Sequence, residues 1–321
     1  MTDEYYGVLL LSHVRVQNAN AISGPLSWGF PAPSAFTGFA HALQRRLAGQ
    51  AGANFGGIGI VCHAFEPQVS RPAGRHTLTF NLTRNPVDKS GGATAIVEEG
   101  RAHLDVSLVI GVRDYLPQED GEALAEAVLA TVHGMRLAGG SILPVAPPVR
   151  TTVQWWPLSG YAQDDAASFR KLRRRLLPGF ALVHRADLLE SALQTLQAID
   201  PAATAYDALL DLVRLNFEPG IPDTDQPYRC EWSIRSRPGW LVPLPIGYAA
   251  LSPLYAPGSV ERSRDADTPL RFVESLYSLG EWVSPHRLTA LEPLFWAHEA
   301  DVDAGLYCCR NRYADFLVRT A

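Results

Sequence analysis

The sequence predicts an α+β protein whose first half, residues 1–150, folds as a ferredoxin-like (RRM-like) domain. Hydrophobic patterns in this half follow the order strand, helix, strand, strand, helix, strand, which is the order of that domain. A polar segment at 75–101 interrupts the pattern and is typical of an inserted, projecting hairpin. Hydrophobic residues make up 47% of the chain, enough for a buried core.

The first strand is expected at residues 7–16, where an apolar run passes into alternation. Residues 17–39 are predicted to form a long polar and aromatic loop, because its three prolines exclude a helix. A helix follows at 35–48, with Ser34 as its expected N-cap. The second strand is predicted at 58–70.

The inserted hairpin at 75–101 has its expected tip near residues 85–92, which are rich in turn formers. Alternation then predicts a strand at 102–112. A helix is expected at 119–137, with acidic residues in its first turn and an end at Gly139–Gly140. A short strand at 141–149, stopped by prolines, completes the pattern.

The second half, residues 151–321, is predicted to pack on the first as a helical and proline-rich portion. A basic helix is expected at 164–175, because its apolar residues recur at spacings of three and four. Two helices follow at 186–198 and 203–216. Extended strands and turns are expected through 238–255, and two further helices are expected at 268–280 and 285–298.

The composition limits the classes of function that the chain can have. The net charge is −5, and residues 186–321 hold 19 acidic against 11 basic residues, a net of −8, which favours a protein-binding role for that segment. The four cysteines form no C-x-x-C pair, so we expect free thiols, no metal site and a reducing cytoplasm. No apolar run is long enough to span a bilayer, and the acidic N-terminus does not resemble an export signal.

Catalytic motifs are missing from the sequence. The phosphate-binding, dinucleotide-binding, zinc-protease and nucleophile-elbow patterns are all absent, so nucleotide hydrolysis, dinucleotide binding, zinc proteolysis and the usual hydrolase mechanism lose their best signals, and no cofactor is expected. A metal-free ribonuclease would need a histidine as general base, and His13 or His41 would be the candidates. Because lone histidines are far more often structural than catalytic, we expect structural roles for both.

Two segments have the residue types that bind single-stranded RNA. In the 17–39 loop, Asn18 and Asn20 supply amides for base edges, and Trp28 supplies a ring on which bases stack. At 136–141, two glycines allow a ligand to approach the backbone closely, and an arginine precedes them. The alternative for this second segment is an ordinary helix C-cap with glycine at C′.

Long motifs across the chain resemble the family of second subunits of the type I-F Csy complex, which are RAMP-superfamily proteins bound to CRISPR RNA. The resemblance is carried by VQNANAISGPLSWGFPAPSAFTGFAHALQRRL (16–47), FNLTRNP (80–86), AIVEEGRAHLDVSL (95–108), MRLAGGSILP (135–144), RRLLPGFALV (174–183), PGWLVPLPIGYAALSPLY (238–255), TPLRFVESLYSLGEWVSPHRL (268–288) and, more loosely, GLYCCRNR (305–312).

The resemblance implies a RAMP fold with the 75–101 hairpin as a thumb, and no catalysis. It implies a heterodimer with the large subunit of the Csy complex that holds the 5′ handle of the CRISPR RNA beside the first backbone subunit and reaches target DNA only indirectly. On this pattern the RNA-binding candidates are Asn18, Asn20, Trp28, Asn81, Arg84, Arg136, Gly139, Gly140, Ser141, Arg173, Arg174 and Arg175.

Two other functions stay open at the level of sequence. One is a RAMP endoribonuclease that cleaves its own guide with His13 or His41 as general base. The other is a scaffold, in which the acidic 186–321 segment docks the large subunit and another protein holds the RNA.

Overall fold

A computed structural model describes most of the chain. Strands β2 (Phe55–Pro67), β7 (Arg101–Val112), β1 (Gly7–Asn20) and β9 (Gly140–Ile142) lie side by side and antiparallel in that order. Helix α1 (Pro33–Leu47) connects β1 to β2, and α2 (Gln118–Val132) follows β7. The predicted alternation of strands and helices is therefore confirmed. The described residues are 5–48, 53–84, 87, 90–94, 96–144, 151–220 and 230–320.

The two faces of this sheet are covered differently. On one face, Leu9 and Leu11 of β1 pack with Phe36 of α1 and Val128 of α2, all of them buried. On the other face, Val8 and Leu10 pack under α3 (Ala162–Arg175) and β11 (Phe180–His184). Alternation along β1 sends successive side chains to opposite faces, so one apolar run supplies both cores.

Strands from the second half close a ring with β2. The ring runs β2, β16 (Phe295–Asp301), β17 (Leu306–Asn311), β14 (Trp240–Ala250), β15 (Val273–Val283) and β11, and β11 returns to β2 through Phe180 and Ala181. Its interior is filled by Trp296, Leu182 and Leu244, and the indole N–H of Trp296 donates to the Leu182 carbonyl at 2.8 Å. A single hydrogen-bonded sheet therefore passes through both halves of the chain.

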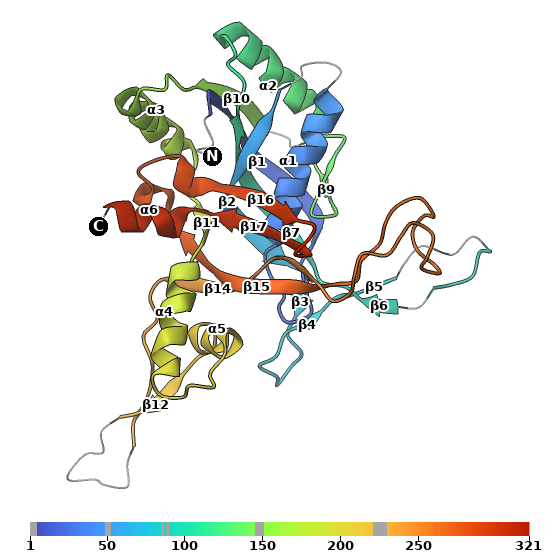
Figure 1. The fold of residues 1–321 in the computed structure, drawn as a ribbon, viewed down its shortest axis with the longest axis vertical. Helices are drawn as coiled ribbons and strands as arrows, with labels where there is room; N and C mark the ends of the chain where they lie inside the picture. Colours follow the sequence, from blue (N-terminus) through green and yellow to red (C-terminus); the bar gives the residue numbers. More distant parts are fainter. Residues whose placement is uncertain are drawn as a thin grey trace.

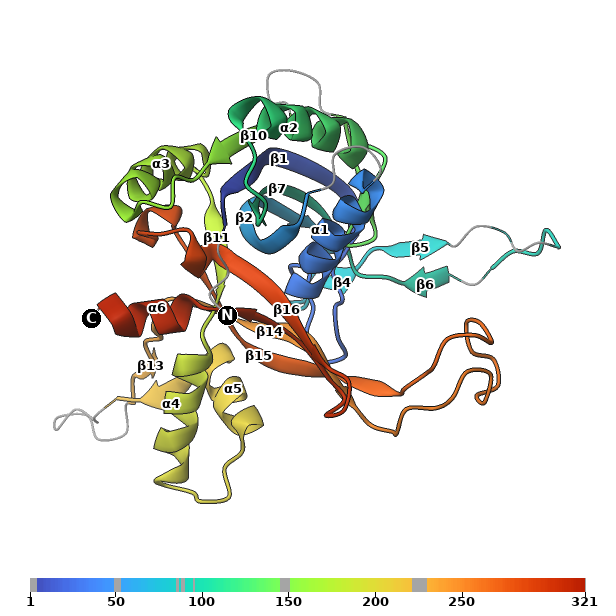
Figure 2. The same ribbon diagram turned by 45° about the horizontal axis from the view of Figure 1, so that its top comes forward.

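Several elements stand away from this body (Figures 1 and 2). The β5–β6 hairpin (Leu82–Arg84 with Ile96–Glu98) projects on the same side of the molecule as the long 251–272 segment. Two small strands, β3 (Val69–Ser70) and β4 (Thr79–Phe80), form its base. The β5–β6 hairpin lies within the segment 75–101, and the predicted tip of that segment falls partly on residues 85–86 and 88–89, outside the described part.

A small helical unit lies at the opposite end from α2 (Figure 1). Helices α4 and α5 fall close to their predicted positions, and a two-stranded sheet, β12–β13, follows them. A final helix, α6, ends the described chain near the ring. The bounds of these elements are α4 (Ala186–Gln197), α5 (Ala205–Val213), β12 (Phe217–Pro219), β13 (Trp232–Ile234) and α6 (Tyr313–Thr320).

The helices predicted at 268–280 and 285–298 are wrong. The first segment is β15, which pairs with both β11 and β14, so tertiary pairing overrides its local helical pattern. The second contains 3₁₀ turns at Pro285–Arg287 and Glu292–Leu294 before it enters β16. Pro293 removes a helical N–H inside that segment, which prevents a continuous α-helix.

Three predicted boundaries in the first half are also wrong. Residues 17–20, assigned to the loop, continue β1. Helix α1 begins at Pro33 with Ala32 as N-cap instead of Ser34, because proline at the first helical position has a suitable φ and needs no N–H partner. Helix α2 ends at Val132 instead of 137, and the next residues form strands β8 (Arg136–Leu137) and β9, followed by β10 (Thr152–Pro157). Residues 145–149 of the predicted strand at 141–149 lie outside the described part.

All four cysteines are free thiols in the structure. Burial raises the pKa of the Cys62 thiol to about 12, and the Cys309 pKa is raised for the same reason. Both thiols therefore stay protonated at neutral pH. No helix in the described part of the chain has the length and apolar character needed to cross a membrane.

A glycine at the junction of the two strand systems gives the first prediction. Gly59 of β2 is buried, and an added Cβ would lie 2.5 Å from the Cγ of buried Leu294. Gly59→Ala should therefore lower the free energy of unfolding by about 1–3 kcal/mol through overpacking. Gly38→Ala is the matched control: its Cβ meets no atom within 4 Å on the exposed side of α1, so it should raise stability by up to about 1 kcal/mol. Equilibrium denaturation measures both, and equal effects would contradict the junction described here.

Candidate nucleic-acid interface

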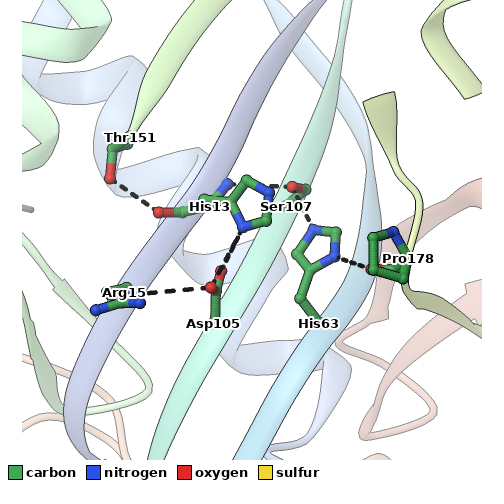
Figure 3. Close-up of polar contacts among 7 residues, drawn as sticks. All are labelled: His13, Arg15, His63, Asp105, Ser107, Thr151 and Pro178. Carbon is green, nitrogen blue, oxygen red and sulfur yellow. Dashed lines mark hydrogen bonds and ion pairs between the residues drawn. The ribbon is translucent and has the colours of Figure 1, made fainter. Parts of the chain in front are cut away.

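Two β-bulges bring a pair of histidines together on the face that α1 and α2 leave free. Strand β1 inserts one extra residue between Leu11 and Val14, and β2 inserts one between Cys62 and Ala64, both against β7. His13, with a φ of 52°, and His63 occupy these bulges. Their rings stack with centroids 4.3 Å apart and 28° between planes (Figure 3). Bulges re-aim side chains in this way beside many functional sites.

Polar partners on β7 hold the first histidine. The Nδ1 atom of His13 lies 3.0 and 3.2 Å from the two carboxylate oxygens of Asp105, and its backbone N–H donates to the Ser107 hydroxyl at 3.1 Å. The Thr151 hydroxyl donates to the His13 carbonyl at 2.9 Å. Figure 3 shows these contacts together with Arg15, whose Nε lies 3.9 Å from Asp105.

The second histidine has both ring nitrogens engaged. Its Nδ1 lies 2.6 Å from the Pro178 carbonyl, which can only accept, so Nδ1 has the proton. Nε2 then accepts from the Ser107 hydroxyl at 2.6 Å. Burial lowers the pKa of His63 below its usual value, and His13 adds to this, while the Pro178 carbonyl and Asp105 oppose it. His63 is therefore neutral at pH 7 and is held rigidly.

Polar residues continue from this pair along β1 and β7 to the end of the sheet. Asn18 occupies a second bulge of β1 with a φ of 58°, and its backbone N–H donates to Nδ1 of His103 at 3.3 Å. Gln68 donates to the Asn18 side-chain oxygen at 2.5 Å. We call this surface the polar strip, formed by His13, Arg15, Gln17, Asn18, His63, Gln68, His103 and Asp105.

The glycine segment forms a hairpin beside the strip. Strand β8 pairs with β9 through Arg136 opposite Ser141, and the two residues at the turn, Ala138 and Gly139, both have positive φ. Positive φ at both turn positions is the requirement of a type I′ hairpin. The helix C-cap alternative is therefore wrong, because α2 ends at Val132.

This hairpin is attached to the end of β1. Ser141 lies opposite Gln17, and the Asn20 backbone N–H donates to the Ala138 carbonyl at 2.8 Å. Gly140 must be glycine, since a Cβ would lie 2.7 Å from the backbone of Gln17 and Ala19. The structure thus brings two separate sequence predictions, the 17–20 segment and the 136–141 segment, onto one surface.

The predicted RNA contacts have different surroundings. The Asn20 side chain closes its own turn through two hydrogen bonds with Ile22, of 2.8 and 3.0 Å. Trp28 is 45% exposed and lies edge-on to Phe80 at 5.2 Å. Asn81 is exposed, and its backbone N–H donates to the Gln68 carbonyl at 3.0 Å, so the base of the projecting hairpin adjoins the strip. Arg84 ends β5 farther out along that hairpin.

The basic helix lies apart from this surface. Arg173 donates to the Leu288 carbonyl at 2.7 Å and to the His286 carbonyl at 3.3 Å, which attaches α3 to the 3₁₀ turn below it. Arg174 and Arg175 are exposed on α3, which lies well away from β9 in Figures 1 and 2. The twelve predicted residues therefore form one group along β1, β9 and the hairpin, and a separate group on α3.

Most residues of the polar strip are not among the sites predicted from the sequence. The signal was present on β7, where Arg101, His103, Asp105 and Ser107 alternate with buried Ala102, Leu104 and Val106. Such alternation places the polar set on one open face. The contribution of His63 could not be inferred, because it depends on a bulge that local sequence does not reveal. Chemically, the surface offers amides, imidazoles and arginines, which suit splayed bases and phosphates.

Comparison with known proteins finds matches over almost the whole chain. A family described as CRISPR-associated protein (Cas_Csy2) matches residues 9–309. A protein of Pseudomonas aeruginosa (strain UCBPP-PA14), described as "CRISPR-associated protein Csy2", is 53% identical over 310 residues, which cover 94% of each chain.

The second prediction concerns the protonation of His63. Because burial lowers its pKa, the ring should remain mostly neutral at pH 6.5, where an ordinary histidine is half protonated. Ring resonances of the histidines, followed by NMR against pH and assigned with His63→Gln, measure the midpoint directly. A His63 midpoint at or above 6.5 would contradict the buried, doubly bonded ring.

Proposed function

The chain belongs to the Csy2 family of CRISPR-associated proteins, and from this premise we propose that it is a non-catalytic RNA-binding subunit of a type I-F Csy complex. In this proposal it holds the 5′ handle of the guide RNA. The observation that carries the proposal is the joined surface of β1 and the β8–β9 hairpin, where Asn18, Arg136 and Ser141 lie on neighbouring strands. Backbone-contacting arginines beside base-reading amides are the combination that single-stranded RNA requires.

The assignment of a RAMP fold is part of this proposal. In its support, the strand order β2, β7, β1, β9 is that of a ferredoxin-like domain, with α1 and α2 on one face. The hairpin β5–β6, inserted between β2 and β7, is the segment that we assign to the thumb. Since such folds host many functions, the site and the family, more than the fold, support RNA binding.

The partners follow from the same premise. We infer that the large subunit of the Csy complex binds the acidic segment 186–321, which contains 19 acidic and 11 basic residues. The thumb hairpin, with Asn81 and Arg84, would meet the guide or the first backbone subunit. Arg173, Arg174 and Arg175 would act on RNA only at long range, through charge, and target DNA would be reached through the guide.

Co-expression tests the whole proposal. The chain is produced with a type I-F repeat–spacer RNA, with and without the large subunit, and RNA is extracted from the purified protein. The proposal predicts a stable heterodimer that contains RNA with a defined 5′ handle. A heterodimer free of RNA would overturn handle binding and leave the scaffold role as the better account.

One arrangement favours a second candidate function, the RAMP endoribonuclease. Asp105 orients the His13 ring through Nδ1, and this carboxylate–imidazole pairing can position a general base. His41 does not share this arrangement, since it lies on α1 against the opposite face, with its ring 6.3 Å from that of His298. His13 is therefore the histidine that the enzyme alternative requires.

The third prediction separates these two functions. Purified protein incubated with repeat RNA should give no discrete cleavage products, because both ring nitrogens of His63 are engaged and this neighbour cannot act as a second proton-transfer group beside His13. Gel analysis of end-labelled RNA measures this. Products that appear with the wild type and vanish with His13→Asn would establish the enzyme instead.

The fourth prediction concerns the binding of phosphate by Arg136. Arg136→Ala should weaken guide binding by the heterodimer about tenfold, the loss expected for a hydrogen bond to a charged group. It should also flatten the dependence of log K on log salt by about 0.7 for each phosphate that the variant no longer neutralises. Arg319→Ala, at an exposed position of α6, is the matched control and should change neither quantity. An unchanged salt slope for Arg136→Ala would contradict the phosphate role.

A further inference from the structure

A partly open aromatic pocket adjoins the polar strip. Its volume is about 490 Å³, and it lies between the loop after β1, the far end of β2, and strands β11, β14 and β15. Pockets of about 300–1,000 Å³ are usual for small-molecule ligands. Six aromatic side chains line it: Trp28, Phe30, Phe65, Phe180, Trp240 and Trp282.

The aromatic rings hold one another in fixed orientations. Phe30 meets Trp282 edge-on at 4.9 Å and 89°, and Phe180 meets Trp240 at 5.3 Å and 74°. Edge-to-face pairs of this kind are a favoured aromatic geometry. Trp240 is 57% exposed and Phe180 is 43% exposed, so ring surface remains available at the rim without rearrangement of the core.

Part of the pocket wall is an edge of β14 that has no neighbouring strand among the described residues. In the described part of the chain, β17 pairs with β14 over Gly247–Ala249, which leaves the earlier half of that edge without a neighbouring strand. Pro243 and Pro245 lie in this half and line the pocket. Because proline has no N–H, the open edge exposes fewer unpaired donors, and another strand cannot readily add to it.

A few polar groups among the lining residues connect the pocket to the strip. His63 belongs to both, since it lines the pocket and stacks on His13. The Ser23 hydroxyl accepts the Ala32 N–H at 3.0 Å and can still donate its own proton to a ligand. The Ser27 hydroxyl lies in the lining as well. The pocket therefore combines flat apolar walls with a small number of hydrogen-bonding atoms.

We propose that this pocket takes one unpaired base of the guide RNA, stacked on Trp240 and Trp28. The inference rests on the proposed RNA-binding function and specifies one of its contacts. RNA held on the polar strip passes His63 at the pocket, so a base splayed from the strand can enter without new protein surface. A planar base uses ring walls and a few edge donors, and stacking of this kind tolerates any base.

The test uses the heterodimer with the large subunit and guide RNAs that have 2-aminopurine at successive handle positions. One position should be strongly quenched by stacking in the wild type and recover its fluorescence in Trp240→Ala. An abasic nucleotide at that position should weaken wild-type binding about tenfold, within the range measured for base–aromatic stacking. In Trp240→Ala the same abasic nucleotide should have little further effect. Trp232→Ala, a 64%-exposed tryptophan on β13, is the matched control and should behave as wild type.

The outcomes separate the pocket from the general function. If the heterodimer binds the guide but no position shows quenching that Trp240→Ala relieves, the pocket proposal fails and handle binding stands. If Trp240→Ala releases the large subunit while every abasic guide binds as before, the pocket holds a protein side chain and the base proposal is overturned. If the heterodimer binds no guide at all, both proposals fail together.

Discussion

The structure depends on β2, which is hydrogen-bonded along both edges. One edge pairs with β7 over most of its length, and the other pairs first with β16 at Ile58 and Gly59 and then with β11 at Val61 and Cys62. The first-half sheet and the six-stranded ring therefore share one strand. Close packing at Gly59, where Leu294 covers the backbone, makes this sharing possible. Neither system can form its full core without the other.

This shared strand also determines where the proposed RNA-binding surface lies. The strands from the second half, with α3, cover only the portion of the sheet that holds Val8, Leu10 and Val109. Beyond that portion β2 no longer pairs with β11, and the same face of the sheet becomes polar. Asp105 and His103 on β7 lie on the face where Val109 is buried. The open polar face, the β8–β9 hairpin at its edge and the aromatic pocket beside β2 all follow from where the ring ends. An RNA strand that follows this surface would meet phosphate-binding, base-reading and stacking groups in succession.

Local sequence predicted the first half well because its strands and helices have strong periodicity. Residues such as Phe36, Leu43 and Val128 recur at helical spacing and are buried where the pattern places them. The second half was harder: β15 has a helix-like distribution of apolar residues, and only its pairing with β11 and β14 makes it a strand. The long motifs shared with the Csy2 family gave the family correctly from the sequence alone.

The site was predictable only in part. Asn18, Arg136 and Ser141 were identified as separate loop features, and the register of β1 with β9 is what joins them. His13 and His63 are 50 positions apart and meet through two bulges, which no periodic pattern reveals. The pocket is assembled from five separate segments, so its aromatic residues had no common signal in the sequence.

Handle binding by this chain can be tested by ultraviolet crosslinking of the assembled complex to its guide, with the crosslinked peptides identified by mass spectrometry. We expect crosslinks from handle nucleotides to residues 17–28 and 136–141 of this chain. Crosslinks from the handle to the large subunit alone, with none to these two segments, would contradict handle binding and assign this chain a purely structural role.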